Sequence, residues 1–366
     1  YIDGGEGVED NGGDTVDYSA FGSTHNITVD LSITDSGNSD YTTVSVNSGS
    51  NDYIKNIENI KGSAGADIIS GDSSNNILDG SAGNDTLSGG EGNDTIIGGT
   101  GIDTVTYITS TSGITVDLKD TDLDGYEVSS DGLNGKDDLS GIEVLIASNN
   151  DDNLIGSDGN DTLIGAGGND TISGGLGADD LRGYGLSTGT DSHLDTVSYA
   201  YVGSLNSVTV DLSAGSGLVT VGTDTSDTDT LTGFENVIGG AGADNITGSS
   251  VANIIKAGSG ADIITGGAGA DDLQGEAGND TFKATSATDG ADIIDGGIDS
   301  DTVDYSALGS SNKITVTLGN EGTSERVFVT SGDTDSVVNI ENIIGTQGND
   351  TITGNSSANT LSGGTG

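Results

Sequence analysis

The chain has 366 residues, of which 64 are glycine and none is Cys, Pro, Met or Trp, and its net charge is −50. A field this negative repels nucleic acid and anionic lipid surfaces, and the absence of cysteine excludes disulfides and thiolate metal sites. No apolar run approaches the ~18 residues that a membrane-spanning helix needs. We therefore expect no nucleic-acid partner and no membrane insertion. The composition favours hard cations, which prefer oxygen ligands.

The predicted elements follow the same order four times along the chain. Each time a string Asp-Thr-Val-x-Tyr is followed by an alternating strand, then by an Ile-Glu or Phe-Glu element, then by a run of nine-residue repeats. We call the segment from the Asp-Thr-Val string to the Glu the insert, and the run of repeats the block. The strings begin at Asp14, Asp103, Asp195 and Asp301, the alternating strands at Ile27, Ile114, Val208 and Ile314, and the four elements contain Glu58, Glu143, Glu235 and Glu341.

This order predicts four modules, at residues 1–102, 103–194, 195–300 and 301–366, the last one incomplete. We expect them to form one continuous solenoid cut from a longer chain. In each insert the alternation Ile-x-Val-x-Leu, or its equivalent, places three apolar side chains on one face. We expect these strands to continue the stack with longer loops. A separate small β-domain in each insert is the less favoured alternative.

Within the blocks, two positions of the nonapeptide are nearly fixed. The sixth residue is Asp or Asn, and the eighth is aliphatic in every repeat except the one that has Phe282. One apolar residue in nine, between polar neighbours, predicts a strand of three residues followed by a turn of six. Such a strand cannot bury its apolar side chain alone, whereas stacked strands build a continuous narrow core.

The repeats match the pattern G-G-x-G-x-D-x-U-x, for example GSAGNDTLS from Gly80 and GGAGADDLQ from Gly266. The chain therefore resembles the repeats-in-toxin (RTX) family of secreted bacterial proteins. The resemblance implies an all-β fold, a right-handed parallel β-roll with two nonapeptides per coil. It also implies type I secretion and a location outside the cell or on the bacterial cell surface.

The same pattern predicts bound calcium. Its glycines allow a tight loop with inward carbonyls, and the Asp at position six adds a carboxylate. Calcium takes six to eight oxygens, so two loops one coil apart are needed for one ion. Eight such pairs can be counted, which predicts at least about eight ions. The predicted metal ligands are Asp67, Asp85, Asp94, Asp103, Asp152, Asp161, Asp170, Asp179, Asp244, Asp262, Asp271, Asp280, Asp301 and Asp350.

Calcium binding should be coupled to folding. Without metal, carboxylates on successive coils repel one another by about 1 kcal/mol per pair at 4 Å in water, and by more where they are buried. Many such pairs together oppose folding, so we expect the chain to fold when metal binds. The alternative is that Gly and Asp are only good turn formers. Turns alone, however, do not need Asp at the same place in nearly every repeat.

Some residues depart from the pattern. Asn76, Asn253 and Asn359 replace the Asp of the second nonapeptide in their blocks, and we predict weak calcium binding or none there. A three-residue expansion before Asp292 makes that residue a doubtful ligand. The Glu of the Ile-Glu element fits an outward strand residue or an auxiliary calcium ligand, and the outward position is slightly favoured.

The function that these observations favour is structural. His25 and His193 have no ligand-spaced partners, and no catalytic motif is present. We therefore expect no enzyme activity, but a calcium-dependent extracellular scaffold in an adhesin, surface layer or filament. Its further partners would be copies of itself or a cell-surface glycan. The alternative is the carboxyl-terminal RTX roll of a secreted protease, lipase or epimerase whose catalytic domain lies outside this chain.

Overall fold

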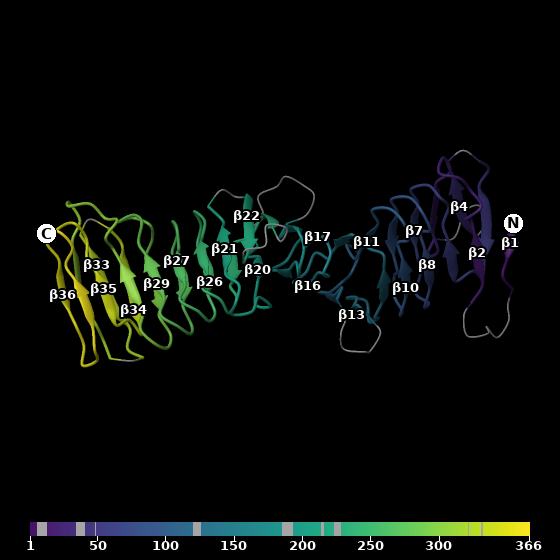
Figure 1. Ribbon diagram of the computed structural model, residues 1–366. Coiled ribbons are helices and arrows are strands. Elements are labelled where there is room, and N and C mark those ends of the chain that lie inside the picture. The colour runs from purple at the N-terminus through teal and green to yellow at the C-terminus, as the bar shows by residue number, and fades with distance from the viewer. Residues whose placement is uncertain are drawn as a thin grey trace. The chain divides into compact units, whose positions relative to one another are not determined.

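The computed structural model describes residues 1–5, 13–33, 41–47, 49–119, 126–184, 193–213, 216–222, 228–320, 322–330 and 332–366. These residues form two compact units (Figure 1). Unit 1 contains Tyr1–Leu176 and Asp180–His193, and unit 2 contains Gly177–Asp179 and Leu194–Gly366. All regular structure in these ranges is β-strand. No helix in them is long and apolar enough to cross a membrane.

Each nonapeptide in the blocks contributes one strand of three residues, as predicted. In unit 1 these strands are β7 (Ile68–Ser70), β8 (Ile77–Asp79), β9 (Thr86–Ser88), β10 (Thr95–Ile97), β16 (Asn153–Ile155), β17 (Thr162–Ile164), β18 (Thr171–Ser173) and β19 (Asp180–Arg182). In unit 2 they are β25 (Asn245–Thr247), β26 (Ile254–Lys256), β27 (Ile263–Thr265), β28 (Asp272–Gln274), β29 (Thr281–Lys283), β30 (Ile293–Asp295), β36 (Thr351–Thr353) and β37 (Thr360–Ser362).

Alternate strands pair in parallel, so two nonapeptides make one coil. Strand β7 pairs with β9 through Ile69 and Leu87, and β8 pairs with β10 through Leu78 and Ile96. The same register continues in unit 2, where β25 pairs with β27 and β26 with β28. The two sheets of each coil enclose the position-eight side chains, which from Ile69 to Val303 are at most 4% exposed. The parallel β-roll is thus confirmed, and one apolar residue per nonapeptide builds its core.

The inserts contribute four strands each, and a fifth strand follows the Glu. The Asp-Thr-Val strands are β2 (Thr15–Asp17), β11 (Thr104–Thr106), β20 (Thr196–Ser198) and β31 (Thr302–Asp304). The alternating strands are β3 (Ile27–Asp30), β12 (Thr115–Asp117), β21 (Val208–Asp211) and β32 (Ile314–Thr317). Two return strands follow, β4 (Thr42–Val46) and β5 (Asp52–Lys55), β13 (Val128–Ser130) and β14 (Asp138–Ser140), β22 (Ser216–Val221) and β23 (Thr228–Thr232), and β33 (Glu325–Val329) and β34 (Thr334–Val338). Strands β6 (Asn59–Lys61), β15 (Val144–Ile146), β24 (Asn236–Ile238) and β35 (Asn342–Ile344) follow the Glu, and β1 (Ile2–Asp3) begins the chain.

The alternating strands do continue the stack. Each pairs in parallel with a nonapeptide strand of the following block, as Val29 of β3 does with Ile69 of β7. The sequence did not predict the antiparallel strand beside it. In module 3, β22 pairs antiparallel with both β21 and β23, and in module 4 β33 does so with β32 and β34. Each of these inserts is therefore a three-stranded meander built into one sheet of the roll.

Glycine at position four of the nonapeptide is required by how closely the coils approach. Gly83 has a φ of +126°, which side chains rarely adopt, and a methyl group added there would lie 2.4 Å from the carbonyl oxygen of Gly65 one coil earlier. Gly260 has the same relation to Gly242, with φ +147° and 2.1 Å. Any larger residue would push the coils apart.

Candidate metal sites between coils

The Asp side chains at position six form ladders that run from coil to coil. In module 1, the backbone N–H of Asp67 donates to Asp85 Oδ1 (2.7 Å), and the N–H of Asp85 donates to Asp103 Oδ1 (2.8 Å). Across the coil, the N–H of Asn76 donates to Asp94 Oδ1 (2.8 Å). All these side chains are at most 1% exposed. The spacing of eighteen residues thus brings together the carboxylates that the sequence paired.

The other blocks repeat this geometry. In unit 1, the N–H of Asp152 donates to Asp170 Oδ1. In unit 2, the corresponding bonds join Asp244 to Asp262, Asp262 to Asp280, Asn253 to Asp271 and Asp280 to Asp301, all at 2.7–2.9 Å. Asp161 belongs to unit 1 and Asp179 to unit 2, so their pairing stays a prediction.

The first ladder residue of each block accepts a hydrogen bond from the backbone of the preceding insert. The N–H of Ile27 donates to Asp67 Oδ1 (2.7 Å), and Ile114, Val208 and Ile314 bond in the same way to Asp152, Asp244 and Asp350. Each block is therefore tied to the insert that precedes it through the carboxylate of a predicted ligand.

The second oxygen of these carboxylates is what points to a cation. In eight of the predicted ligands Oδ2 is buried and has no hydrogen-bond partner among the described residues: Asp85, Asp94, Asp103, Asp262, Asp271, Asp280, Asp301 and Asp350. A buried charged oxygen without a partner costs far more than a single hydrogen bond contributes. The fold therefore leaves a row of acceptors that a metal ion would satisfy.

Backbone carbonyls approach the same oxygens. A methyl group added at Gly80 would lie 2.4 Å from Asp85 Oδ2 and 2.7 Å from the carbonyl oxygen of Gly98, one coil on. At Gly275 the corresponding distances, to Asp280 Oδ2 and the Gly296 carbonyl oxygen, are 2.3 and 2.7 Å. Glycine at position one thus leaves a space bounded by a carboxylate and by a carbonyl of the next coil.

Burial makes these carboxylates hard to ionise when no cation is present. Desolvation, together with the neighbouring Asp67 and Asp103, raises the pKa of Asp85 to about 7. Burial likewise raises the pKa of Asp94, Asp262 and Asp301 to about 7. A divalent cation would supply the missing countercharge and keep the groups ionised.

The donor set fits calcium. Within the described ranges no three His, Asp or Glu side chains converge on one point, so backbone carbonyls have to complete any site. All donors are oxygens, and calcium accepts carboxylates together with carbonyls in flexible arrangements of six to eight. The Asp at position six and the loop carbonyls of adjacent coils would hold the ion.

Comparison with known families agrees. The family model described as the RTX calcium-binding nonapeptide repeat matches residues 56–87, 70–105, 146–181, 229–250, 247–282, 286–307 and 339–366, just over half of the chain. The chain belongs to this RTX family. It is a calcium-binding repeat protein. No curated protein matches the chain significantly.

Two sequence interpretations of this RTX chain need correction. The three-residue expansion does not displace Asp292, because the loop absorbs it: the N–H of Asp271 donates to Asp292 Oδ1 (3.0 Å), and Asp292 is only 9% exposed. The Glu of the Ile-Glu element is not simply an outward strand residue. The N–H of Asp103 donates to Glu143 Oε2 (2.9 Å), and the N–H of Asp301 donates to Glu341 Oε2 (3.0 Å).

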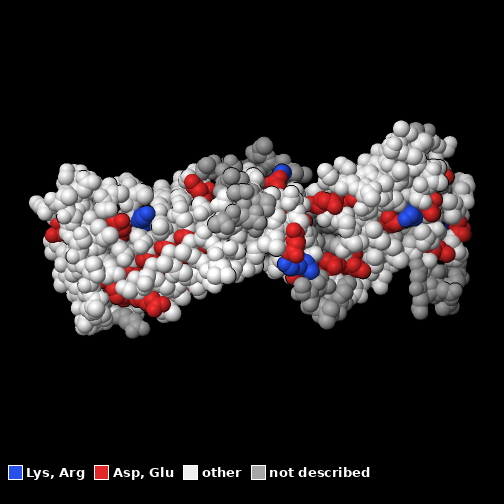
Figure 2. Space-filling model, viewed as in Figure 1, with Lys and Arg blue, Asp and Glu red and all other residues white. Residues whose placement is uncertain are grey.

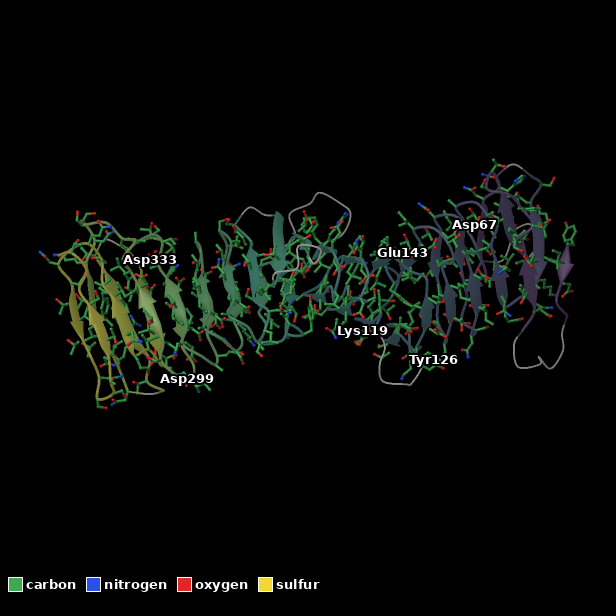
Figure 3. All side chains as sticks on the ribbon, viewed as in Figure 1. Asp67, Lys119, Tyr126, Glu143, Asp299 and Asp333 are labelled. Carbon is green, nitrogen blue, oxygen red and sulfur yellow. The ribbon has the colours of Figure 1, made fainter. Side chains whose placement is uncertain are left out.

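These Glu residues end the ladders. Asp67 and Glu143, both labelled in Figure 3, are the first and last carboxylates of the ladder that runs from module 1 into module 2. Glu58 and Glu235 bond in the same way to the N–H groups of Asp14 and Asp195. The longer Glu side chain thus reaches the position that the Asp of a further nonapeptide would occupy.

The asparagines use their amide groups in a way that Asp could not. Asn76 Nδ2 donates to the carbonyl oxygen of Glu58 (2.7 Å), while its Oδ1 accepts from the N–H of Asp72 (2.9 Å). Asn253 bonds in the same way to the Glu235 carbonyl and the Ser249 N–H. Weak calcium binding at these positions stays a prediction, and the structure gives a reason for it.

Three buried carboxylates in the inserts were not predicted from the sequence. The hydroxyl groups of Tyr107, Tyr199 and Tyr305, which are at most 3% exposed, donate to Oδ2 of Asp137, Asp229 and Asp335 at 2.8–2.9 Å. Oδ1 of these residues accepts from the N–H of Asp94, Asp179 and Asp292. The signal was present: each Asp lies 30 residues after its Tyr and begins the Asp-x-aliphatic pattern of a nonapeptide.

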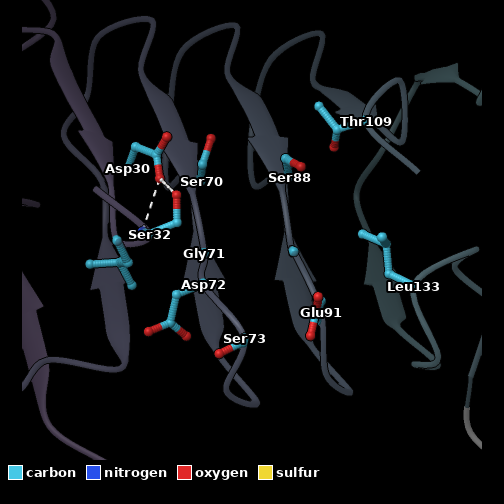
Figure 4. Close-up of a pocket in the computed structure, with 12 residues that line it drawn as sticks. Asp30, Ser32, Ser70, Gly71, Asp72, Ser73, Ser88, Glu91, Thr109 and Leu133 are labelled. Atoms are coloured by element: carbon cyan, nitrogen blue, oxygen red, sulfur yellow. Dashed lines mark hydrogen bonds between the residues drawn. The ribbon is translucent and has the colours of Figure 1, made fainter. Parts of the chain in front are cut away.

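The described surface of unit 1 contains a groove. A groove of about 560 Å³ in unit 1 is lined by hydroxyl and carboxylate side chains, among them Asp30, Asp72, Ser70 and Ser88 (Figure 4). Asp30 is engaged by the N–H and hydroxyl of Ser32. No histidine or lysine that could serve as a base lines it. Over the face shown in Figure 2, acidic side chains outnumber basic ones.

Proposed function

We propose that this chain is a structural segment of an extracellular surface protein, and that calcium stiffens it after secretion. Its role is to hold apart or connect other parts of an adhesin, surface layer or filament, and the chain itself catalyses no reaction. The observation that carries the proposal is the set of buried ladder carboxylates, such as Asp85, Asp94 and Asp262, whose Oδ2 has no partner among the described residues. Such a series costs folding energy in every coil unless calcium is bound.

The extent of this arrangement supports a scaffold. The ladders occupy the blocks of both units, and the inserts continue the stack rather than form separate domains. A chain that folds only with calcium suits secretion, because it passes unfolded through a low-calcium cytosol and folds where calcium is millimolar. Copies of the chain, or cell-surface glycans bridged by calcium, are the partners that an acidic surface of this kind would take.

The alternative, the carboxyl-terminal roll of a secreted enzyme, uses the same loops and the same calcium. The two proposals differ in the remainder of the gene. Further modules or an anchoring domain would support the scaffold, and a catalytic domain upstream would support the enzyme.

Single-molecule pulling with and without calcium tests the mechanical role. We expect each module to resist force in calcium and to extend as an unstructured chain in chelator, with magnesium alone failing to restore resistance. A chain that extends at the same force in both conditions would contradict the scaffold. Circular dichroism on the same samples shows whether calcium folds the chain at all.

A further inference from the structure

Each insert returns the chain to the ladder through a three-residue segment, Asn-Ile-Glu, Gly-Ile-Glu or Gly-Phe-Glu. Its first residue has a left-handed backbone in all four modules, with φ +52° at Asn56 and Asn339, +64° at Gly141 and +75° at Gly233. Only Gly, and less often Asn, adopts this conformation readily. The restriction to these two residues therefore has a backbone cause.

This left-handed residue directs its carbonyl to the place that a nonapeptide carbonyl occupies elsewhere. A methyl group added at Gly98 would lie 2.0 Å from the Gly141 carbonyl oxygen and 2.8 Å from Asp103 Oδ2. At Gly296 the distances to the Asn339 carbonyl oxygen and Asp301 Oδ2 are 2.1 and 2.5 Å. Within a block, Gly80 meets the Gly98 carbonyl oxygen and Asp85 Oδ2 in the same arrangement.

The Glu of this segment takes the place of the ladder Asp of a nonapeptide. Its Oε2 accepts the hydrogen bond from the backbone of Asp103 or Asp301 that Asp Oδ1 of the next nonapeptide accepts elsewhere in the ladder. Three residues thus reproduce what Gly at position one and Asp at position six supply in a regular loop. They do so some 40 residues further along the chain rather than eighteen.

The site so formed contains a buried acceptor without a partner. Asp103 and Asp301 are 0% exposed, and in both the Oδ2 atom makes no hydrogen bond among the described residues. Neither they nor Glu143 and Glu341 take part in the ion pairs of Lys61, Lys119 and Arg182. Among the described residues, two carboxylates and a carbonyl therefore meet at each junction without a basic side chain.

We propose that each of these junctions is a calcium site of a second kind, outside the nonapeptide motif. In unit 1 the ion is held by Asp103 Oδ2, the Gly141 carbonyl and the Glu143 carboxylate, and in unit 2 by Asp301 Oδ2, the Asn339 carbonyl and the Glu341 carboxylate. Asp14, Asn56 and Glu58 repeat the Glu hydrogen bond and the carbonyl approach, but Asp14 is only part-buried, so the proposal is confined to the junctions at Asp103 and Asp301. The calcium ladder thus extends one step into each of these inserts.

The inference rests on calcium binding by the chain, as the proposed function does, but it can fail separately. Anomalous difference maps from crystals of the full chain grown in calcium should show a peak among Asp103 Oδ2, the Gly141 carbonyl and Glu143, and another at Asp301. Peaks in the nonapeptide loops with none at these junctions would overturn the inference and leave the proposed function standing. An ordered chain without any peaks would remove both.

Native mass spectrometry provides a count in solution. Glu143→Gln keeps an acceptor for the Asp103 N–H but removes the charge, so it should lose one ion at limiting calcium. The double variant with Glu341→Gln should lose two. Glu91→Gln, the same change at an exposed loop position, should lose none. An unchanged count in Glu143→Gln would contradict the site, and the crystal maps decide the matter if the double variant does not fold.

Discussion

Asp85 in the first block and Asp137 in the insert of module 2 are both buried, and Oδ1 of each accepts a backbone N–H from the coil before it. They differ at Oδ2. In Asp85 that oxygen has no partner among the described residues, whereas in Asp137 it accepts the hydroxyl of Tyr107. At this ladder position the block thus leaves Oδ2 for a cation, whereas the insert supplies a tyrosine hydroxyl as hydrogen-bond donor.

Removal of calcium should have the largest effect, and it should affect the blocks more than the inserts. We expect chelation at pH 8 to abolish most β-structure, because buried carboxylates then face one another without a countercharge. Hydrogen exchange followed by mass spectrometry should show loss of protection in the block peptides around β9 and β10 at higher calcium than in peptides around β14. Equal calcium midpoints for block and insert would show that tyrosine does not replace the ion.

Acid should partly replace calcium. In the ion-free fold the pKa of Asp85, Asp262 and Asp301 is raised from 3.8 to about 7, with burial as the first cause. The folded chain therefore binds more protons than the unfolded one between these values. The contribution of these carboxylates to stability is therefore fully present below pH 4 and is lost as the pH rises through 7.

Circular dichroism of the calcium-free chain should accordingly show more β-structure at pH 5 than at pH 8. Calcium competes with these protons, so its apparent affinity should rise over the same interval. A calcium-free chain that is equally unfolded at both pH values would contradict the role of the buried carboxylates.

A single methyl group should separate a block glycine from an insert glycine. Gly83→Ala places a Cβ 2.4 Å from the Gly65 carbonyl oxygen at φ +126°, and the strained backbone alone costs about 1–3 kcal/mol. Gly203→Ala, in a turn of the module 3 insert, meets nothing within 4 Å and should change stability by less than about 0.5 kcal/mol. Urea unfolding in saturating calcium measures both. Similar losses in the two variants would refute the close approach of the coils.

The sequence predicted the blocks better than the inserts for a physical reason. Blocks repeat every nine residues, so the buried Ile69 and the ladder residue Asp85 could be placed by counting. In the inserts, the corresponding contacts span 30 to 50 residues and do not follow the nine-residue period. Glu143 is recognised only in the structure, where the chain returns to the ladder, and Asp137 could have been found only from its 30-residue distance from Tyr107, which the other inserts repeat. The left-handed Gly141 also carries no signal by itself, since glycine is common everywhere in this chain.

Removal of one hydroxyl group should show how much the tyrosine hydrogen bond stabilises the insert. Tyr107→Phe leaves Asp137 Oδ2 buried without its donor, which costs about 1–3 kcal/mol. Tyr201→Phe, with a side chain that is 41% exposed, should be nearly neutral. Urea unfolding in saturating calcium compares the two, and native mass spectrometry shows whether the freed oxygen takes up an extra ion. A Tyr107→Phe chain as stable as the wild type, with no ion gained, would mean that the hydrogen bond does not stabilise the insert.

The smallest expected effect lies where the two regions meet, at Asn76. Asn76→Asp removes the Nδ2 donor to the Glu58 carbonyl and sets a carboxylate oxygen against it, at a cost of roughly 1 kcal/mol. Asn75→Asp is the matched control, because that side chain is exposed and uses only its oxygen, as acceptor from the Asn93 N–H. Both variants add one negative charge, so a difference between them in urea unfolding isolates the amide bond. If Asn76→Asp instead gained an ion and stability, Asn76 would be a calcium position weakened only by its missing charge. The calcium-binding part of the block would then begin one nonapeptide earlier on this side of the coil.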